Sequence, residues 1–232
     1  MTSWRVDQGS YGTPEYLAID QVLGEGSECD VLRAGALKTP ALLASRRTPE
    51  DAVEAFRDDE EIDCAWRSTR NAPIFHDGNT VSYSIIVESP AKQSPVTFED
   101  FIGPKLVEAL KPFEDDLEID DISSAIRTGD HTTPDEYPNG RTLSGNALYD
   151  FEDTTVCQGI INIGSWRDVD GWREMEMDED VREAVENLPY IDASRGEVLE
   201  SLVKSFTGGN YDELDLNGYA DQIEKVSSKY AN

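Results

Sequence analysis

The sequence predicts an α+β fold in one domain, with a mixed, largely antiparallel sheet and flanking helices. Groups of strand-like segments are interrupted by helical segments, and this mixed order is typical of the α+β class. The 232 residues, 38% of them hydrophobic, suit one large domain or two small ones with a real core. Since no linker, repeat or low-complexity tract divides the chain, we expect a single domain over residues 1–232.

The first predicted helix has clear start and stop signals. Thr13 is a typical N-cap, Pro14 suits the first turn, and Glu15 adds an acidic charge there. Gly24 and Gly26 are expected to end this helix near residue 23. Comparable signals predict helices over 48–58, over 97–113 with a kink at Gly103 and Pro104, over 181–188, over 195–206 with a stop at Gly208 and Gly209, and over 219–230.

Several segments have the pattern of β-strands. Two of them, RTLSGNALYDF at 141–151 and TTVCQGIINIG at 154–164, are joined by Glu152 and Asp153, so we expect an antiparallel pair. The others are DVLRAGA at 30–36, ALLASR at 41–46, CAWRS at 64–68 and NTVSYSIIV at 79–87.

The charge balance excludes two classes of partner. The chain has 48 acidic and 20 basic residues, a formal net charge of -28, spread along its length. Such a field repels nucleic acid phosphates and anionic membranes, while 20 aromatic residues and regular apolar periodicity argue against disorder. An acidic surface with 13 Arg and only 7 Lys is typical of a halophilic protein, in which molar salt screens the repulsion; an acidic mesophilic protein is the alternative.

The cysteines and the N-terminus predict a cytoplasmic, reducing compartment. Cys29, Cys64 and Cys157 are odd in number and form no CxxC motif, so neither a disulfide framework nor a metal site is expected. The N-terminus has no features of a secretory signal, and no apolar run approaches the roughly 18 residues that span a membrane.

Further motifs follow one another in a defined order. They are EYLAIDQVL, WRSTRNAPIFHDGNTVSYSI, DDISS, GRTLSGNA, CQGIINI, VREAVENLP, GEVLESLVKSF and DQIEKVSSKY. In this order they resemble the lipoate–protein ligase branch of the biotin/lipoate ligase family, over nearly the whole chain. The smaller C-terminal accessory domain of some family members has no counterpart before Asn232.

The resemblance implies an activity, with its cofactors and partners. Such enzymes use ATP and Mg²⁺ to convert lipoate to lipoyl-adenylate, and then transfer the lipoyl group to a lysine; related octanoyltransferases start from an acyl-carrier thioester. The implied partner is the lipoyl domain of a 2-oxoacid dehydrogenase, a glycine-cleavage H protein, or an active ligase paralogue. The chemistry requires backbone N–H groups at the phosphate, a cation at the developing negative charge and an apolar tunnel for the acyl chain.

By resemblance, the loop after residue 66 is the substrate and adenylate loop, but its glycines have been replaced. Arg70, Asn71 and Ala72 stand where the family has a glycine triplet, and their side chains would fill the space that the phosphate needs. The positions that match the two ends of the loop are Arg67, Ser68, His76, Asp77 and Asn79, the last of which contacts the adenine in the family.

The second departure concerns the catalytic lysine of the family, which falls on Thr142. Arg141 is its neighbour, but successive strand residues point to opposite faces, so Arg141 is expected to face away. A threonine hydroxyl carries no charge, and loss of such a donor lowers the rate by about 10² to 10³. The remaining matches are Asp121 (with Asp120 in the place of an asparagine), Ser144 and Gly145, and Gln158, in place of a histidine, before Gly159.

Several alternatives stay open at this point. His76 is either a substrate-loop residue or part of a structural His-Asp turn, and Cys157 is either a thioester nucleophile or, as its apolar neighbours indicate, a buried core residue. We expect a lipoate–protein ligase-like protein of low or no catalytic activity that acts as a binding or partner subunit. The alternatives are an active lipoyl or octanoyl transferase with an unusual site, and an unrelated acidic binding module. A cation that reaches Thr142 from Arg67, Arg70 or Arg127 would favour the active enzyme.

Overall fold

The computed structural model describes residues 3–44, 53, 62–67, 74–76, 79–88, 98–120, 124–128, 142–164 and 189–230. The predicted helices over 48–58 and 181–188 lie outside these ranges, apart from residue 53. Everything below concerns the described residues.

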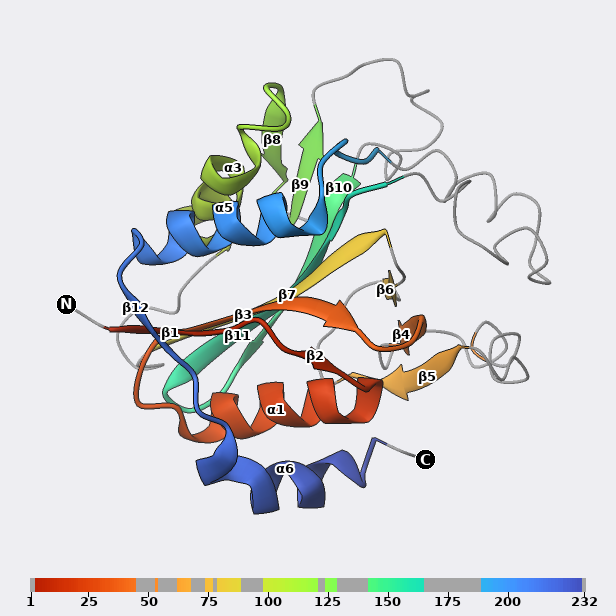
Figure 1. Ribbon diagram of the computed structural model, residues 1–232, viewed down its shortest axis with the longest axis vertical. Coiled ribbons are helices and arrows are strands. Elements are labelled where there is room, and N and C mark those ends of the chain that lie inside the picture. Colours follow the sequence, from red (N-terminus) through yellow and green to blue (C-terminus); the bar gives the residue numbers. More distant parts are fainter. Residues whose placement is uncertain are drawn as a thin grey trace.

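A large mixed sheet forms the centre of the molecule (Figure 1). Its strands run in the order β12-β1-β3-β7-β11-β10-β9-β8, and the short β2 pairs with β3. The central pairs are antiparallel, whereas β1 is parallel to both β3 and β12. The strands are β1 (Trp4–Asp7), β2 (Ser10–Tyr11), β3 (Val31–Leu37), β7 (Thr80–Glu88), β8 (Leu117–Asp120), β9 (Ala125–Thr128), β10 (Thr142–Asp150), β11 (Thr154–Asn162) and β12 (Tyr211–Glu213).

A second, three-stranded sheet and the helices complete the fold and confirm the predicted α+β class (Figure 1). The small sheet has the order β5-β4-β6, from β4 (Ala41–Ala44), β5 (Asp63–Trp66) and β6 (Ile74–His76). One face of the large sheet is covered by α3 (Gly103–Leu110) and α5 (Arg195–Thr207). The other face is covered by α1 (Thr13–Gly26), on which α6 (Ala220–Ser227) packs.

The first helix is longer than its sequence pattern predicts. Its N-cap is Gly12 rather than Thr13, and Pro14 lies in the first turn as expected. The helix continues through Gly24 and ends at Gly26, so Gly26 ends it as predicted, whereas the end expected near residue 23 was wrong. The reason is tertiary packing, because Gly24 lies against Phe151 beside β11 and leaves no room for a side chain.

Replacing Gly24 with Ala is expected to destabilise the protein by about 1–3 kcal/mol, because the new methyl group overfills the contact between α1 and β11. A Cβ at Gly24 would lie 2.3 Å from Phe151 Cε2 and 2.8 Å from Val156 Cγ2. Gly26→Ala is the matched control, since nothing lies within 4 Å of a Cβ there. Urea denaturation of both variants tests this, and equal free energies of unfolding would contradict it.

Other predicted elements agree with the structure. The β10–β11 antiparallel pair forms with its turn at Glu152 and Asp153. The helix α5 stops at Gly208, whose φ of 64° is left-handed. The helix expected over 97–113 is instead a π-helical turn, Phe98–Ile102, followed by α3, with residues 111–113 in a turn.

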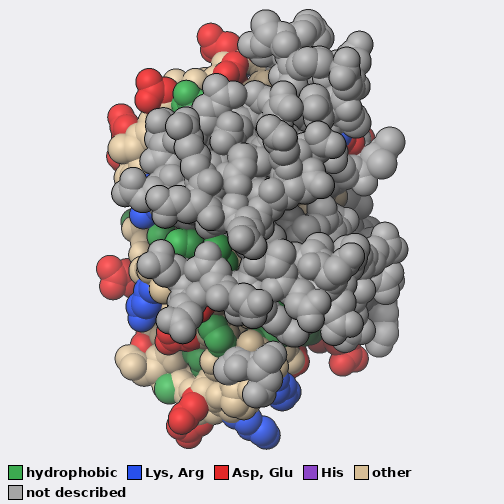
Figure 2. All heavy atoms as spheres, turned by 90° about the vertical axis from the view of Figure 1, so that its right-hand side faces the viewer, with side chains coloured by type: hydrophobic (Ala, Val, Ile, Leu, Met, Phe, Trp, Pro, Cys, Tyr) green, Lys and Arg blue, Asp and Glu red, His purple; other side chains and the backbone are tan. Residues whose placement is uncertain are grey.

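The charge of the surface and the lengths of the helices concern possible interactions with other molecules and with membranes. Acidic side chains stand along the margins of the face in Figure 2, with Lys and Arg side chains between them. No helix in the described ranges is long and apolar enough to cross a membrane. The halophilic interpretation stays a prediction from composition.

Candidate functional site

The two faces of the central sheet decide which predicted side chains meet. Side chains alternate between the faces along a strand, and directly paired residues on neighbouring strands share a face. Ile126 belongs to the core beneath α3 and α5, so its neighbour Arg127 lies on the other face, where α1 packs on Val156. Thr142 pairs directly with Arg127 and shares this face. We call it the site face.

The predicted residues divide between the two faces. Gly145 and Gln158 lie on the site face. Ser144 and Gly159 lie on the opposite face, where Tyr83 Oη is 2.8 Å from Ser144 Oγ and a Cβ on Gly159 would meet the Tyr83 ring. The Ser144 side chain is therefore a buried partner of Tyr83. Outside the described residues lie Ser68, Arg70, Asn71, Asp77, Asp121 and Arg141.

The position expected to hold the family's lysine has an uncharged side chain next to an arginine. Thr142, at the start of β10, is half-buried and lies directly opposite Arg127 on β9. Arg127 forms an ion pair with Asp120 at the end of β8, through its Nη2. The two side chains are only 23% and 19% exposed. Because one carboxylate balances one guanidinium, these three residues together carry no net charge.

Asn162, which sequence reasoning missed, fixes the backbone beside Thr142. Its Nδ2 donates to the carbonyl oxygens of Pro189 at 3.2 Å and of Thr142 at 3.5 Å. Asn162 pairs with Thr80 on β7 and lies on the site face. Its Oδ1 is buried and has no hydrogen-bond partner within the described part of the chain. The signal for it was an amide in the otherwise apolar strand sequence GIINI.

The candidate loop residues at the ends of the small sheet are buried. His76, on β6, contacts Ser82 Oγ through its Nδ1, and Ser82 pairs with Ile160 and projects from the site face of β7. Arg67 directly follows β5, and burial lowers the pKa of its guanidinium to about 10. Asn79 instead extends the β7–β11 pairing of the large sheet, because its carbonyl oxygen accepts from Ile163 N at 2.8 Å.

His76 is held in its neutral form. Burial, and secondly the positive charge of Arg67, lower the pKa of His76 to about 3, from its ordinary value of 6.5. The neutral imidazole forms a hydrogen bond with Ser82 and holds the hydroxyl of that residue in place. The structure thus makes His76 a buried contact between the small sheet and β7.

This burial predicts a pH dependence of stability. The unfolded chain takes up a proton on His76 below about pH 6.5, whereas the folded protein does not until about pH 3. Stability should therefore fall as the pH drops through this window, by about 1.4 kcal/mol per pH unit from this group alone. The difference in unfolding free energy between wild type and His76→Gln, measured from pH 8 to pH 4, isolates the contribution. A pH-independent difference would contradict it.

A buried charged network anchors α1 to the sheet, and the sequence analysis did not predict it. Arg33 on β3 forms ion pairs with Asp20 of α1 and with Asp7 of β1, the latter at 3.2 Å. Asp20 also accepts hydrogen bonds from Ser84 Oγ and Gln158 Nε2, both at 2.6 Å. Burial acts to lower the pKa of Arg33, but the charges around it, chiefly Asp20, raise it by more, so the side chain stays charged.

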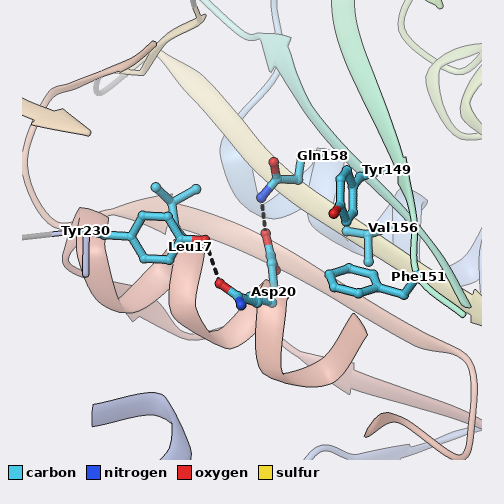
Figure 3. Close-up of a pocket in the computed structure, with 8 residues that line it drawn as sticks. Leu17, Asp20, Tyr149, Phe151, Val156, Gln158 and Tyr230 are labelled. Atoms are coloured by element: carbon cyan, nitrogen blue, oxygen red, sulfur yellow. Dashed lines mark hydrogen bonds between the residues drawn. The ribbon is translucent and has the colours of Figure 1, made fainter. Parts of the chain in front are cut away.

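Gln158, in the place of the family's histidine, thus faces a carboxylate at the base of a small hollow (Figure 3). The hollow is bordered by Leu17, Tyr149, Phe151 and Tyr230, and Tyr230 donates a hydrogen bond to Gln21 at 2.8 Å. Its volume of about 20 Å³ holds little more than one water molecule. This hollow is therefore too small for a lipoyl chain.

Cys157 is a core residue, as its apolar neighbours indicated. It is fully buried among the side chains beneath α3 and α5, and burial raises the pKa of its thiol. A thiol of this kind is protonated and inaccessible, which does not suit a thioester nucleophile. Within the described ranges, no three His, Cys, Asp or Glu side chains gather in a way that could hold a metal ion.

Comparison with known proteins gives matches only at the level of structure. No family model matches the sequence, and no curated protein matches it. A bi-partite lipoate protein ligase from Thermoplasma acidophilum, studied with its E2 lipoyl domain, superposes with a TM-score of 0.73 at 13% identity, over 99% of this chain and 92% of that chain. LipL1 of P. falciparum in complex with lipoate gives 0.69 at 11% identity, over 99% of this chain and 72% of that one.

A lipoate-protein ligase A bound with ATP gives a TM-score of 0.67 at 15% identity, over 98% of this chain and 93% of that chain. These matches span almost the whole chain. Because the identities are so low, these matches establish the fold alone. The activity has to be inferred from the residues of the site. The chain therefore has the fold of the lipoate–protein ligases.

Proposed function

We propose that this protein acts in protein lipoylation as a lipoate–protein ligase-like binding or partner subunit that does not itself form lipoyl-adenylate. The observation that carries the proposal is Thr142, an uncharged residue where the resemblance places the catalytic lysine. Arg127, the cation across from it, is neutralised by Asp120. An oxyanion at this position would thus meet no net positive charge from these three residues. Stabilisation of the negative charge on the oxyanion usually accelerates acyl transfer more than any other single effect.

The loop sequence supports the same conclusion. Arg70, Asn71 and Ala72 replace the glycine triplet with which the family binds the adenylate phosphate. Backbone N–H groups approach a phosphate most closely where glycine allows it, so these replacements weaken phosphate binding as well. Two separate requirements of adenylation are therefore reduced in one chain.

The proposed partners follow from the reaction. They are the lipoyl domain of a 2-oxoacid dehydrogenase, a glycine-cleavage H protein, or an active ligase paralogue that supplies the missing groups. The T. acidophilum ligase of the same fold is bi-partite, which supports a role for a second chain. Lipoate and, by resemblance, ATP with Mg²⁺ are the proposed ligands, and residues 1–232 are proposed to form one catalytic-type domain.

A second candidate function has one observation in its favour. Arg127 lies on the same face as Thr142 and directly opposite it. If its guanidinium performs the work of the lysine, the protein is an active lipoyl or octanoyl transferase with an arginine in the site.

Binding and transfer measurements separate the two functions. We expect isothermal titration calorimetry in molar salt to detect binding of lipoate, of an unmodified lipoyl domain, or of both. We also expect mass spectrometry to detect no acylated lysine on the lipoyl domain after its incubation with the protein and either lipoate, ATP and Mg²⁺ or an octanoyl-carrier thioester. A modified lysine would establish the second function, and absence of binding to lipoate, lipoyl domain and active ligase paralogue alike would refute the first.

A further inference from the structure

The strands β8, β9 and β10 place an arginine within the candidate site by their register alone. Arg127 pairs with Thr142 on one side and with Glu118 on the other, so these three side chains share the site face. The helix α3 packs on the opposite face of β8 and β9, around Ile126 and Ile119. Arg127 therefore faces the site rather than the helical core.

Asp120 determines where the guanidinium lies. It pairs with Ala125, two residues along β9 from Arg127, so the ion pair draws the arginine diagonally toward the Ala125–Gly145 pair. Small side chains make up this part of the sheet. A Cβ built on Gly145 would have only Thr142 Cγ2, at 4.0 Å, within reach among the described residues. The guanidinium thus contacts Asp120 beside a part of the sheet in which the Ala125–Gly145 pair contributes only a methyl group and a hydrogen.

The ion pair does not use all the donors of the arginine. Asp120 contacts Nη2, whereas Arg127 Nε is buried and has no hydrogen-bond acceptor within the described part of the chain. A guanidinium presents five N–H donors in a planar fork that fits a carboxylate or a phosphate. Partial burial also strengthens its interaction with an anion relative to a fully solvated site.

We infer that Arg127 is the anion-binding residue of this site and that it binds the oxyanion group of the ligand, either the carboxylate of a fatty acid such as lipoate or a phosphate. The inference rests on the proposed function, because it assigns the residue that holds the ligand of that same site. Asp120 orients the guanidinium and at the same time reduces its affinity for a second anion. Arg127, on β9, thus holds the oxyanion of the bound ligand, while its ion pair with Asp120 leaves the site without the net positive charge that adenylation requires.

This arrangement predicts effects of opposite sign for the two partners of the ion pair. Arg127→Met should weaken binding about tenfold or more, since a charge-assisted contact is lost. Arg127→Lys should weaken it less, because the charge remains but the fork is lost. Asp120→Asn should strengthen it severalfold, because the amide oxygen still accepts from Arg127 while the competing negative charge is removed. If the ion pair only stabilises the fold, Arg127→Met and Asp120→Asn should both weaken binding.

The test is calorimetric titration of the purified protein and these variants, at one fixed salt concentration, with lipoate and with pyrophosphate. Lipoamide, which has the same ring and chain without the carboxylate, is the control ligand. Because it is compared with lipoate on the wild-type protein, this comparison does not depend on the folding of any variant. We expect either lipoate, with lipoamide at least tenfold weaker, or pyrophosphate to bind through Arg127, and the ligand that responds identifies the oxyanion.

Three results would overturn the inference. If wild type binds lipoate but Arg127→Met binds it equally well, Arg127 is not the anion-binding residue, and the proposed function stands. If wild type binds neither lipoate nor pyrophosphate, this inference fails, and with it the proposal of lipoate as ligand. Lipoamide binding as tightly as lipoate, with no binding of pyrophosphate, would also contradict a role for the oxyanion.

Discussion

Replacement of Arg33 with Met is expected to lower the free energy of unfolding by about 3–5 kcal/mol, the largest loss of stability among the substitutions considered for this protein. Arg33 is 1% exposed and Asp20 is 2% exposed, so removal of the guanidinium leaves a buried carboxylate without its cation. Ser84 and Gln158 still donate hydrogen bonds to Asp20, but neither carries a charge that balances it.

Urea denaturation at constant salt measures this loss, and two further variants make the result specific. The double variant Asp20→Leu, Arg33→Met should be less destabilised than Arg33→Met alone, because it leaves no unpaired charge at Asp20. Lys105→Met breaks a partly exposed ion pair with Glu108, 3.1 Å apart, and a hydrogen bond from Lys105 Nζ to Ser205 O, and should lower stability by about 1 kcal/mol. If Arg33→Met behaves like Lys105→Met, the network does not anchor α1.

Restoration of the family's residues is expected to produce adenylation activity. The variant that combines Thr142→Lys with glycines at Arg70, Asn71 and Ala72 should release pyrophosphate in a lipoate-dependent reaction, or at least be stabilised by ATP and lipoate. Thr142→Lys alone should do less, because the phosphate would still lack backbone donors and room. Both sites act on the same adenylate, so their effects should be non-additive.

The control for this rescue is Thr142→Gln, which has a long polar side chain without the charge and should restore nothing. Thermal denaturation with and without ATP and lipoate detects binding even in the absence of turnover. If the four-residue variant folds normally yet shows neither stabilisation nor pyrophosphate release, the site has diverged at further positions, and the non-catalytic function would require a different binding surface.

Elements with strong local signals were predictable from the sequence. The β10–β11 pair has strand-like segments on both sides of a two-residue turn, and α5 has a glycine that adopts a left-handed conformation where the helix stops. The C-terminal helix likewise buries Ile223 and Val226, as its apolar spacing indicated. By contrast, Gly24 has the local signal of a helix end. Its contact with Phe151 involves a residue more than a hundred positions away, so no local pattern reveals it.

The site residues stay a prediction from the sequence, which gives no information on the direction of their side chains. Strict alternation would place Thr142 and Ser144 on one face, but the register shifts between them, and Ser144 turns to the opposite face. Arg127 was one of three arginines that the sequence offered as a cation for Thr142, and the register of β9 and β10 places it directly opposite that residue. The charged residues Asp20 and Arg33, each among apolar neighbours, were the visible sign of a buried pair.

The central claim, that the chain does not adenylate lipoate, is tested most directly by lipoate-dependent pyrophosphate release from the purified wild-type protein in molar salt with ATP and Mg²⁺. We predict a rate equal to that of the protein-free control, because Thr142 provides no charge and Arg127 is balanced by Asp120. Pyrophosphate release above that control, abolished by omission of lipoate, would contradict the claim and identify the protein as an active ligase.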